Sequence, residues 1–466
     1  MRTVLEELAD YATSLSADEI PEPARGAVLR AFVDGIACAF YGIQSRPAET
    51  VRSVAAEMGG SPGVSLWGLA EKTSAYWAAL VNGVALRYWD FNDVYFGPAW
   101  TAHPSDNIAA VFGAAEHVGA TGGQFLDALV VAYEIQMAFS DLPVEANLWH
   151  RGWHHTVACS YASAAAASRL LGLDADQAAD AMALAGARSN TLAEIRHGAI
   201  SMDKALSAPF AAASGLLCAF LARAGYTGCR TLLEGRYGFG FAVAGGAEVS
   251  GLIPDRGAFR AGKISLKPYP VEGMTITMVE AALNSREKYD GRIEDISAIT
   301  VRTYEEALTK PSWDDDKIVP ASKETADHSF TFCVALAIVA GRVTLEEFGP
   351  EWLTDPRVLS LIPRIRFETS GEYTELYRAG SRPAAVEIHG PDGSAFSEVL
   401  HPRGDPARPA DWRDLRVKFA MAAEPYLGAD TDSGFERLMA IDQDQDIRSI
   451  ARLLRGHDHS ERSGHA

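Results

Sequence analysis

The sequence predicts a mainly α fold in which a large all-helical domain is interrupted by a smaller α+β lid domain. Three observations support this prediction. The first part of the chain, about 265 residues, reads as helices joined by short turns. The next part contains segments that alternate as strands do, and the chain becomes helical again from Trp412. With 466 residues, the chain is also too long for one ordinary hydrophobic core.

The segments of the first part carry apolar residues at helical spacing. Helices are predicted over residues 4–15, 23–41, 49–58, 74–88, 107–118, 123–139, 155–171, 174–187 and 202–224. Residues 61–68 are the one short strand-like piece between them. Asp174 stands three residues before Gln177, as in a capping box. Because small side chains let helices approach closely, the alanine- and serine-rich helix at 155–171 is expected at the centre of a bundle.

The character of the sequence changes at Lys267-Pro268-Tyr269-Pro270. A helix over 273–288 is followed by a strand over 293–304 and a helix over 325–340. Strands are predicted over 363–369, 384–388 and 396–400, and a turn at 391–393 joins the last two as a hairpin. We therefore expect a lid domain over 268–402 and a discontinuous helical domain made of 1–267 and 403–466. The helical tail from Trp412 should rejoin the first domain and end in a polar, frayed stretch.

The charge and the cysteines restrict the function classes. A net charge of −19 argues against nucleic acid and anionic membranes as partners. It also repels an anionic substrate, so a site for an acid must bring its own cations. Five scattered cysteines without a CxxC pair argue against disulfides and indicate a cytoplasmic location. We expect no signal peptide and no membrane span, because the amino terminus lacks a basic start and no run of eighteen apolar residues occurs.

Common cofactor and hydrolase signatures are missing from the sequence. The glycines at 235–246 do not fit a Walker loop, and neither a GxGxxG nor a GxSxG lies between a predicted strand and a helix. Neither HExxH nor a spaced His–Cys cluster is present, so no catalytic metal is expected.

Two acids and a histidine lie on a segment rich in glycine, proline and aromatic residues. Asp90 and Asp93 precede His103, and either Ser105 or Asp106 is placed to cap the next helix. Loops ahead of a helix commonly carry catalytic groups. The alternative is that the aspartates form turns and His103 is a surface histidine, and the segment taken alone fits this alternative better.

His154-His155-Thr156 comes immediately before the small-residue helix. A histidine at a helix N-terminus faces the positive end of the macrodipole, which lowers its pKa and lets the neutral ring act as a base. The alternative is that one histidine caps the helix through solvent while the other packs, since neighbours cannot point the same way.

Two lysines stand at unusual positions. Lys204 is near the start of an otherwise apolar, alanine-rich helix, and Lys267 lies at the expected domain junction. Most such lysines are surface residues. A lysine on a close-packed helix needs an anionic partner when it is buried, and a substrate carboxylate would serve.

Six short motifs follow one another between residues 82 and 329. They are Asn82-Gly83 through Asp90-Phe91-Asn92-Asp93, His103-Pro104-Ser105, Gly152-Trp153-His154-His155-Thr156, Met202-Asp203-Lys204, Lys267-Pro268-Tyr269-Pro270 and Ala326-Asp327-His328-Ser329. In this order they resemble the motifs of the MmgE/PrpD superfamily, which includes 2-methylcitrate dehydratases, cis-aconitate decarboxylases and an iminodisuccinate epimerase. Each motif alone is weak, whereas six in order are specific.

The resemblance implies a site at these motifs and a homodimer. It also implies a helical domain interrupted by an α+β lid, which agrees with the boundaries drawn from the residues. The catalytic residues that it implies are Asp90, His103, His154, Lys204 and Lys267. Neighbours in or beside the same motifs are expected to bind the substrate: Asp93, Thr156, Tyr269 and Glu272.

The chain departs from the family pattern at four positions. Asn92 stands where the family often has a second aspartate, and His155 replaces the usual proline. Glu272 stands where decarboxylase-like members carry a histidine, and Phe332 where they carry a tyrosine. Because a donor is lost and a carboxylate gained, these differences disfavour a tricarboxylate substrate and the decarboxylase activity.

The reading that follows is a cofactor-independent hydro-lyase acting on a small di- or tricarboxylic acid. The two lysines would hold substrate carboxylates, and the charge that builds up next to them would be shared with these cations. His103 and His154 would act as base and acid, and Asp90 would orient a histidine or tune its pKa. The alternatives are an epimerase or decarboxylase that uses the same residues, and a non-catalytic protein that binds a small acid.

Overall fold

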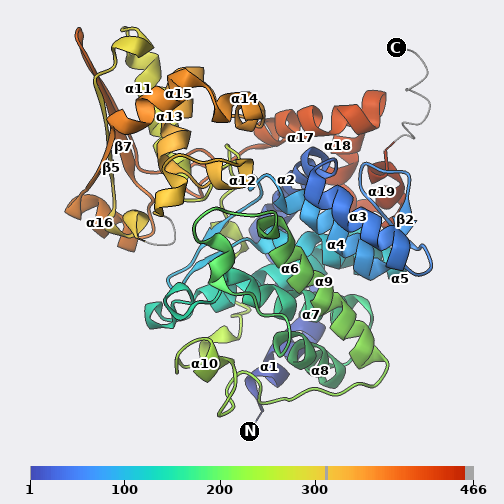
Figure 1. Ribbon diagram of the computed structural model, residues 1–466. Helices are drawn as coiled ribbons and strands as arrows, with labels where there is room; N and C mark the ends of the chain where they lie inside the picture. Colours follow the sequence, from blue (N-terminus) through green and yellow to red (C-terminus); the bar gives the residue numbers. More distant parts are fainter. Residues whose placement is uncertain (1, 310–312, 457–466) are drawn as a thin grey trace.

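The computed structural model of the protein describes residues 2–309 and 313–456, and its fold is mainly helical, as predicted (Figure 1). Its buried apolar side chains form two large clusters. One combines residues between Leu5 and Leu266 with residues between Leu415 and Leu454, and the other contains residues between Val271 and Val399. We call the parts of the chain around them the helical body and the lid. Whether each folds as an independent domain, with boundaries at 268 and 402, stays a prediction.

The helices of the body lie close to the predicted positions. They are α1 (Val4–Ser14), α2 (Glu22–Gly42), α3 (Arg46–Met58), α4 (Ala75–Arg87), α5 (Ile108–Val118), α6 (Gly122–Ser140), α7 (Cys159–Leu170), α8 (Ala175–Gly186) and α9 (Asp203–Arg223). The short α10 (Phe239–Ala242) was not predicted. Two small hairpins join them, β1 (Val64–Ser65) with β2 (Lys72–Thr73) and β3 (Tyr95–Phe96) with β4 (Thr101–Ala102). The predicted capping box of Asp174 and Gln177 is present at α8.

The alanine-rich helix α7 lies inside the body and contacts α1, α5, α6, α8 and α9, as its small side chains predict. Gly215 of α9 approaches it so closely that an added Cβ would lie 2.5 Å from the carbonyl oxygen of Ser160. By length and composition, α9 could cross a membrane, and α2 with α3 passes the same test only as a pair bent by 86°. Since 67% of the most apolar stretch of α9 is buried within the protein, it also fits a core helix.

Gly42, the last residue of α2, faces the backbone of α4. A Cβ at this position would fall on the carbonyl oxygen of Ala85. We therefore expect Gly42→Ala to push the helices apart and to lower the free energy of unfolding in urea by about 1–3 kcal/mol. Gly26→Ala in the same helix is the control, because its Cβ would meet only side-chain atoms at 3.7 Å or more. It should stabilise the protein by roughly 0.5–1 kcal/mol, and equal effects of the two changes would contradict the close approach.

The lid contains a four-stranded sheet in the order β6-β5-β7-β8. The strands are β5 (Ala298–Thr303), β6 (Ile365–Thr369), β7 (Ala384–Gly390) and β8 (Gly393–Val399). β5 and β6 run parallel, whereas the other pairs are antiparallel and β7–β8 is the predicted hairpin. Helix α11 (Thr275–Lys288) packs on β7 and β8, and α13 (Phe330–Ala340) packs on α11 (Figure 1). The short helices α14 (Pro350–Leu353), α15 (Pro356–Leu361) and α16 (Gly371–Arg378) were not predicted.

The helix predicted over 325–340 is wrong in its first turns. The short helix α12 (Lys323–Ala326) ends before Asp327, and α13 begins only at Phe330. Ser329 caps α13, because its Oγ accepts the backbone N–H of Phe332 at 3.1 Å. The interruption places Asp327 and His328 on a turn instead of a helix face.

The tail returns to the body through α17 (Trp412–Leu427), α18 (Thr431–Met439) and α19 (Arg448–Leu454), as predicted. Phe419 of α17 packs edge-on against Phe40 of α2, with ring centroids 6.1 Å apart. The Lys418 ammonium donates to the Asp34 carboxylate and to the carbonyl oxygen of Phe91, both at 2.7 Å. Helix α17 therefore supports the loop that follows α4. Residues 457–466, expected to be frayed, lie outside the described part.

Candidate active site

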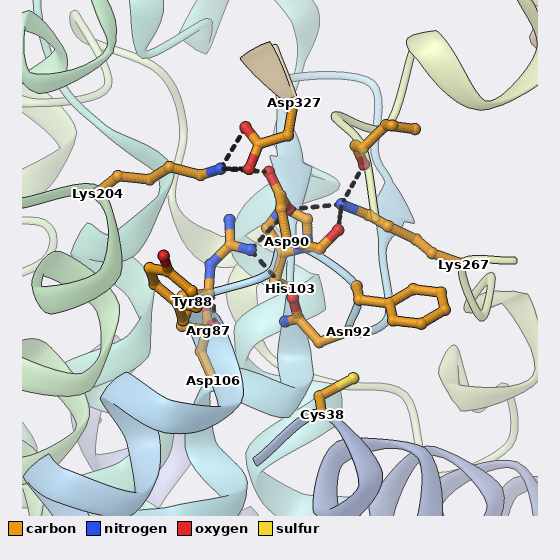
Figure 2. Close-up of polar contacts among 12 residues, drawn as sticks. Cys38, Arg87, Tyr88, Asp90, Asn92, His103, Asp106, Lys204, Lys267 and Asp327 are labelled. Carbon is orange, nitrogen blue, oxygen red and sulfur yellow. Dashed lines mark hydrogen bonds and ion pairs between the residues drawn. The ribbon is translucent and has the colours of Figure 1, made fainter. Parts of the chain in front are cut away.

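Charged and imidazole side chains from the body and the lid meet in one buried cluster. The members are Arg87, Asp90, His103, His154, His155, Arg196, Lys204, Lys267, Asp327 and His328. No member is more than 9% exposed. The five predicted catalytic residues all belong to it, and Figure 2 shows Asp90 at its centre, with Lys204, Lys267 and Arg87 pointing toward it.

Asp90 is the only described non-glycine residue with a positive φ, at 52°. Aspartate tolerates this left-handed backbone better than most residues do. The turn directs the carboxylate into the cluster, where its Oδ1 accepts from Lys267 Nζ at 2.6 Å and from Arg87 Nη1 at 2.7 Å. Its Oδ2 lies 3.4 Å from Lys204 Nζ and from His328 Nε2. Although burial raises the pKa of Asp90, Arg87 and the two lysines hold it well below the usual value.

The Lys267 ammonium has no free donor. Its three protons go to Asp90 Oδ1 at 2.6 Å, to the carbonyl oxygen of Asp90 at 2.9 Å and to that of Val271 at 3.0 Å. In this conformation Lys267 therefore fixes the loop of Asp90, whereas we had expected it to bind a substrate carboxylate.

Lys204 pairs with the lid. Its ammonium contacts both oxygens of Asp327 at 2.6 Å, and Lys323 contacts Asp327 Oδ2 at 2.9 Å. Burial lowers the pKa of Lys204 to about 8, against the opposing effect of Asp327. Lys204 is thus a cation that can release its proton near neutral pH.

The ring of His103 has a defined tautomer. Its Nδ1 lies 2.6 Å from the carbonyl oxygen of Asp93, which can only accept, so Nδ1 carries the proton. The Nε2 lone pair of His103 forms no hydrogen bond with any residue that the structure describes. His103 therefore holds a free Nε2 lone pair that can take a proton.

The Nε2 atom of His154 also carries a lone pair, but it already accepts a hydrogen bond. Its Nδ1 lies 3.1 Å from Thr156 Oγ1, and its Nε2 accepts from Arg196 Nε at 3.0 Å. His155 lies between the two other rings, with centroid distances of 5.1 Å to His103 and 4.1 Å to His154. Its Nδ1 is buried without a partner among the described residues.

Burial keeps these histidines neutral. Together with neighbouring cations, it lowers the pKa values of His103, His154 and His155 well below the usual range, and that of His328 to about 3. In the unfolded chain they would titrate near pH 6.5. Below that pH the unfolded state binds more protons than the folded state, so stability falls as the pH falls. Each histidine removes up to about 1 kcal/mol of the free energy of unfolding between about pH 7 and about pH 6.

Two buried carboxyl groups act in the opposite sense. Burial raises the pKa of Asp93 to about 6 and that of Asp106 to about 7, so both take up protons in the folded state. They offset about half of the histidine effect. We expect a net loss of roughly 1–2 kcal/mol in the free energy of unfolding from about pH 7 to about pH 6, measured in urea. His155→Gln should weaken this dependence, and stability that rises toward pH 6 would contradict neutral histidines.

The four predicted substrate-binding residues differ in their contacts within the protein. Asp93 accepts the backbone N–H and the hydroxyl of Ser105 at 3.1 and 2.6 Å, and Thr156 lies against His154. Tyr269 packs on the lid core. Glu272 accepts the backbone N–H of Met274 at 2.8 Å, just before α11, and burial raises its pKa. Contact of these four with a substrate stays a prediction.

Sequence reasoning missed four members of the cluster. Arg87 stands three residues before Asp90 and could have been found as an i,i+3 partner. Asp327 and His328 lie in a motif that was recognised but given no role. Arg196 had no signal, because it ends a single turn of 3-10 helix (Ala193–Arg196), which is too short to show a periodic pattern.

A metal ion would meet competition in this cluster. Oxygen and nitrogen atoms of Asp90, Asp327 and His328 lie within 4.8 Å of one another. The Lys204 ammonium, however, already neutralises both carboxylates, at 2.6 and 3.4 Å. A dication would have to displace it, so the donor set fits a cation poorly.

Two hollows lie outside the cluster. One, of about 540 Å³, is lined by apolar lid residues such as Trp313 and Phe367. The other, of about 710 Å³, lies between residues 199–201 of the body and 315–325 of the lid. Neither is lined by a member of the cluster. The cluster itself is closed to solvent in this conformation, since all its members are buried.

The sequence is similar to known proteins along both the body and the lid. Family sequence models match residues 6–251 as an MmgE/PrpD N-terminal domain and residues 269–443 as an MmgE/PrpD C-terminal domain. A 2-methylcitrate dehydratase of Cupriavidus necator is 30% identical, over 73% of this chain and 73% of the relative. A mitochondrial 2-methylcitrate dehydratase of Yarrowia lipolytica is 27% identical over 85% and 78%. A cis-aconitate decarboxylase of Mus musculus is 24% identical over 98% and 94%.

Proposed function

The chain belongs to the MmgE/PrpD family, and on that premise we propose that it is a lyase that removes water from a small hydroxylated di- or tricarboxylic acid without a cofactor. The named relatives dehydrate 2-methylcitrate or decarboxylate cis-aconitate. The observation that carries the proposal is the buried cluster in which four cations face two ionised aspartates and neutral imidazoles.

The cluster supports binding of an anion. Arg87, Arg196, Lys204 and Lys267 bring four positive charges, and Lys323 adds a fifth beside the cluster. Asp90 and Asp327 bring two negative charges that remain ionised at neutral pH. A dry site with excess positive charge attracts carboxylates and stabilises negative charge that develops next to them. Since the cluster is closed, the substrate would enter when the lid and the body separate.

His103 is the best-placed base. Its Nε2 would take the proton from the carbon next to a substrate carboxylate, and the electron pair left behind would form the double bond as hydroxide leaves. The leaving hydroxide needs a proton to become water. Lys204, with a pKa of about 8, suits this role better than His154, whose Nδ1 proton is turned toward Thr156. We therefore assign the acid to Lys204, and Asp90 and Lys267 to positioning.

Dehydration is preferred over decarboxylation because of the lid. Phe332, which stands where decarboxylase-like members carry a tyrosine, is fully buried in the lid core and packs against Phe348. It has no hydroxyl to offer the substrate. Assembly as a homodimer and a cytoplasmic location are further parts of the proposal.

The test is nuclear magnetic resonance of the purified protein in deuterated buffer with 2-methylcitrate, citrate, cis-aconitate and amino-dicarboxylates. Loss of water from a hydroxy acid is the expected result. Release of carbon dioxide, or deuterium uptake without net change, would instead assign a decarboxylase or an epimerase. Binding without any exchange would mean that the protein is a non-catalytic acid binder.

A further inference from the structure

Arg196 differs from the other buried cations in its partners. Arg87 and Lys267 pair with Asp90, and Lys204 pairs with Asp327. Arg196 is only 5% exposed, yet it forms no ion pair with any residue in the described ranges. A buried charge without a counter-charge is costly and usually has a functional reason.

The partners of Arg196 are two neutral histidines, one from the body and one from the lid. Its Nε donates to His154 Nε2 at 3.0 Å, and its Nη1 lies 3.3 Å from His328 Nε2. His328 Nδ1 lies 2.6 Å from the Asp327 carboxylate, which can only accept, so the Nε2 of His328 is also a lone pair. The guanidinium therefore occupies both lone pairs at the line where the body meets the lid.

A carboxylate is a better partner for this guanidinium than two imidazoles. It accepts two parallel, charge-assisted hydrogen bonds, and such bonds are roughly twice as strong as those between neutral groups. Burial, with Arg87 nearby, lowers the pKa of Arg196 to about 10, which a bound anion would reverse. Lys267 cannot compete for the anion in this conformation, because its three protons are already donated.

We propose that Arg196 binds a carboxylate of the substrate and leaves the Nε2 atoms of His154 and His328 as it does so. The inference rests on the proposed function, since it names the residue that would recognise the acid. Binding of the substrate then uncovers His154, which can accept a hydrogen bond from the substrate hydroxyl and orient it. Arg196 thus couples recognition of the acid to the assembly of the site.

The experiment compares Arg196→Gln, Arg196→Lys and the control Arg188→Gln, an exposed arginine in the same part of the chain. Calorimetric affinity for 2-methylcitrate and citrate is measured together with KM and kcat for any acid that is turned over. Arg196→Gln should weaken binding and raise KM roughly 10- to 100-fold, because it loses hydrogen bonds to a charged group. Arg196→Lys should fall between, and the control should match the unaltered protein.

Free guanidinium separates recognition from a structural role. Millimolar guanidinium chloride should restore part of the affinity of Arg196→Gln, which a merely misfolded site would not show. Unchanged KM and affinity in Arg196→Gln, with turnover intact, would overturn this inference alone. If the unaltered protein neither binds nor converts any of the acids, the proposed function fails and this inference fails with it.

Discussion

Replacing Asp90 with asparagine should lower the free energy of unfolding by about 3–5 kcal/mol, because removing one partner from a buried ion pair leaves its cations uncompensated. Three cations, Arg87, Lys204 and Lys267, lie within 3.4 Å of this carboxylate. Asparagine has nearly the same shape and tolerates the positive φ of this position. The substitution therefore removes charge with little added backbone strain.

Urea denaturation at neutral pH measures the Asp90→Asn effect. Asp176→Asn is the control, since this aspartate also pairs with an arginine but its side chain is 86% exposed, so its loss should change stability little. Catalysis should be lost together with stability, because Asp90 positions both lysines. An Asp90→Asn protein as stable as the original would show that this carboxylate does not balance the cluster.

His103→Gln should reduce turnover by about 10²–10⁴-fold, the usual contribution of a general base. The glutamine amide reaches the position of Nε2 but is not basic, so it cannot take up the proton. The hydrogen bond from Nδ1 to Asp93 is lost, but Asp93 still accepts two hydrogen bonds from Ser105, so the loop should keep its place. Because the acid would be bound mainly through cations, its affinity should change only slightly.

Deuterium exchange into the bound acid is the sharpest measurement for His103→Gln, since it reports proton removal alone. His117→Gln provides the control: this histidine lies at the exposed end of α5, where its ring contacts Phe220. It should exchange at the original rate. If His103→Gln exchanged as fast as this control, the base would have to be another residue, with His154 the next candidate.

Most helices of the body could be predicted because apolar residues recur in them at helical spacing, and α3 and α5 also end at a glycine, Gly59 and Gly119. The predicted helix over 325–340 was wrong for a local reason. Its apolar pattern continues through Ala326 and Phe330, whereas the hydroxyl of Ser329 competes for the backbone and starts a new helix. Short helices such as α14 and α15 were missed because one turn is too little for a periodic pattern to show.

The candidate site was predicted only as far as its motifs reach. Asp90, His103, His154, Lys204 and Lys267 meet in one cluster, but their contacts could not be inferred from sequence. Spacing along the chain does not show that Lys267 donates hydrogen bonds to Asp90, 177 residues away. Arg196 belongs to no sequence pattern, because it ends a single turn of 3-10 helix. Only the fold places it beside His154 and His328.

The C-terminal helices, which are synthesised last, complete the hydrophobic core of the helical body, whose first helices are synthesised first. Helix α17 covers Phe40 of α2, and its Lys418 holds the carbonyl oxygen beside Asp90. The lid is synthesised between these two parts of the body. The apolar face of α2 that α17 covers therefore stays exposed until the whole lid has been synthesised. Contacts of such long sequence separation form slowly. The buried cluster of charges therefore forms late in folding. A chain truncated within the lid would expose apolar surface that favours aggregation and would lack a complete site.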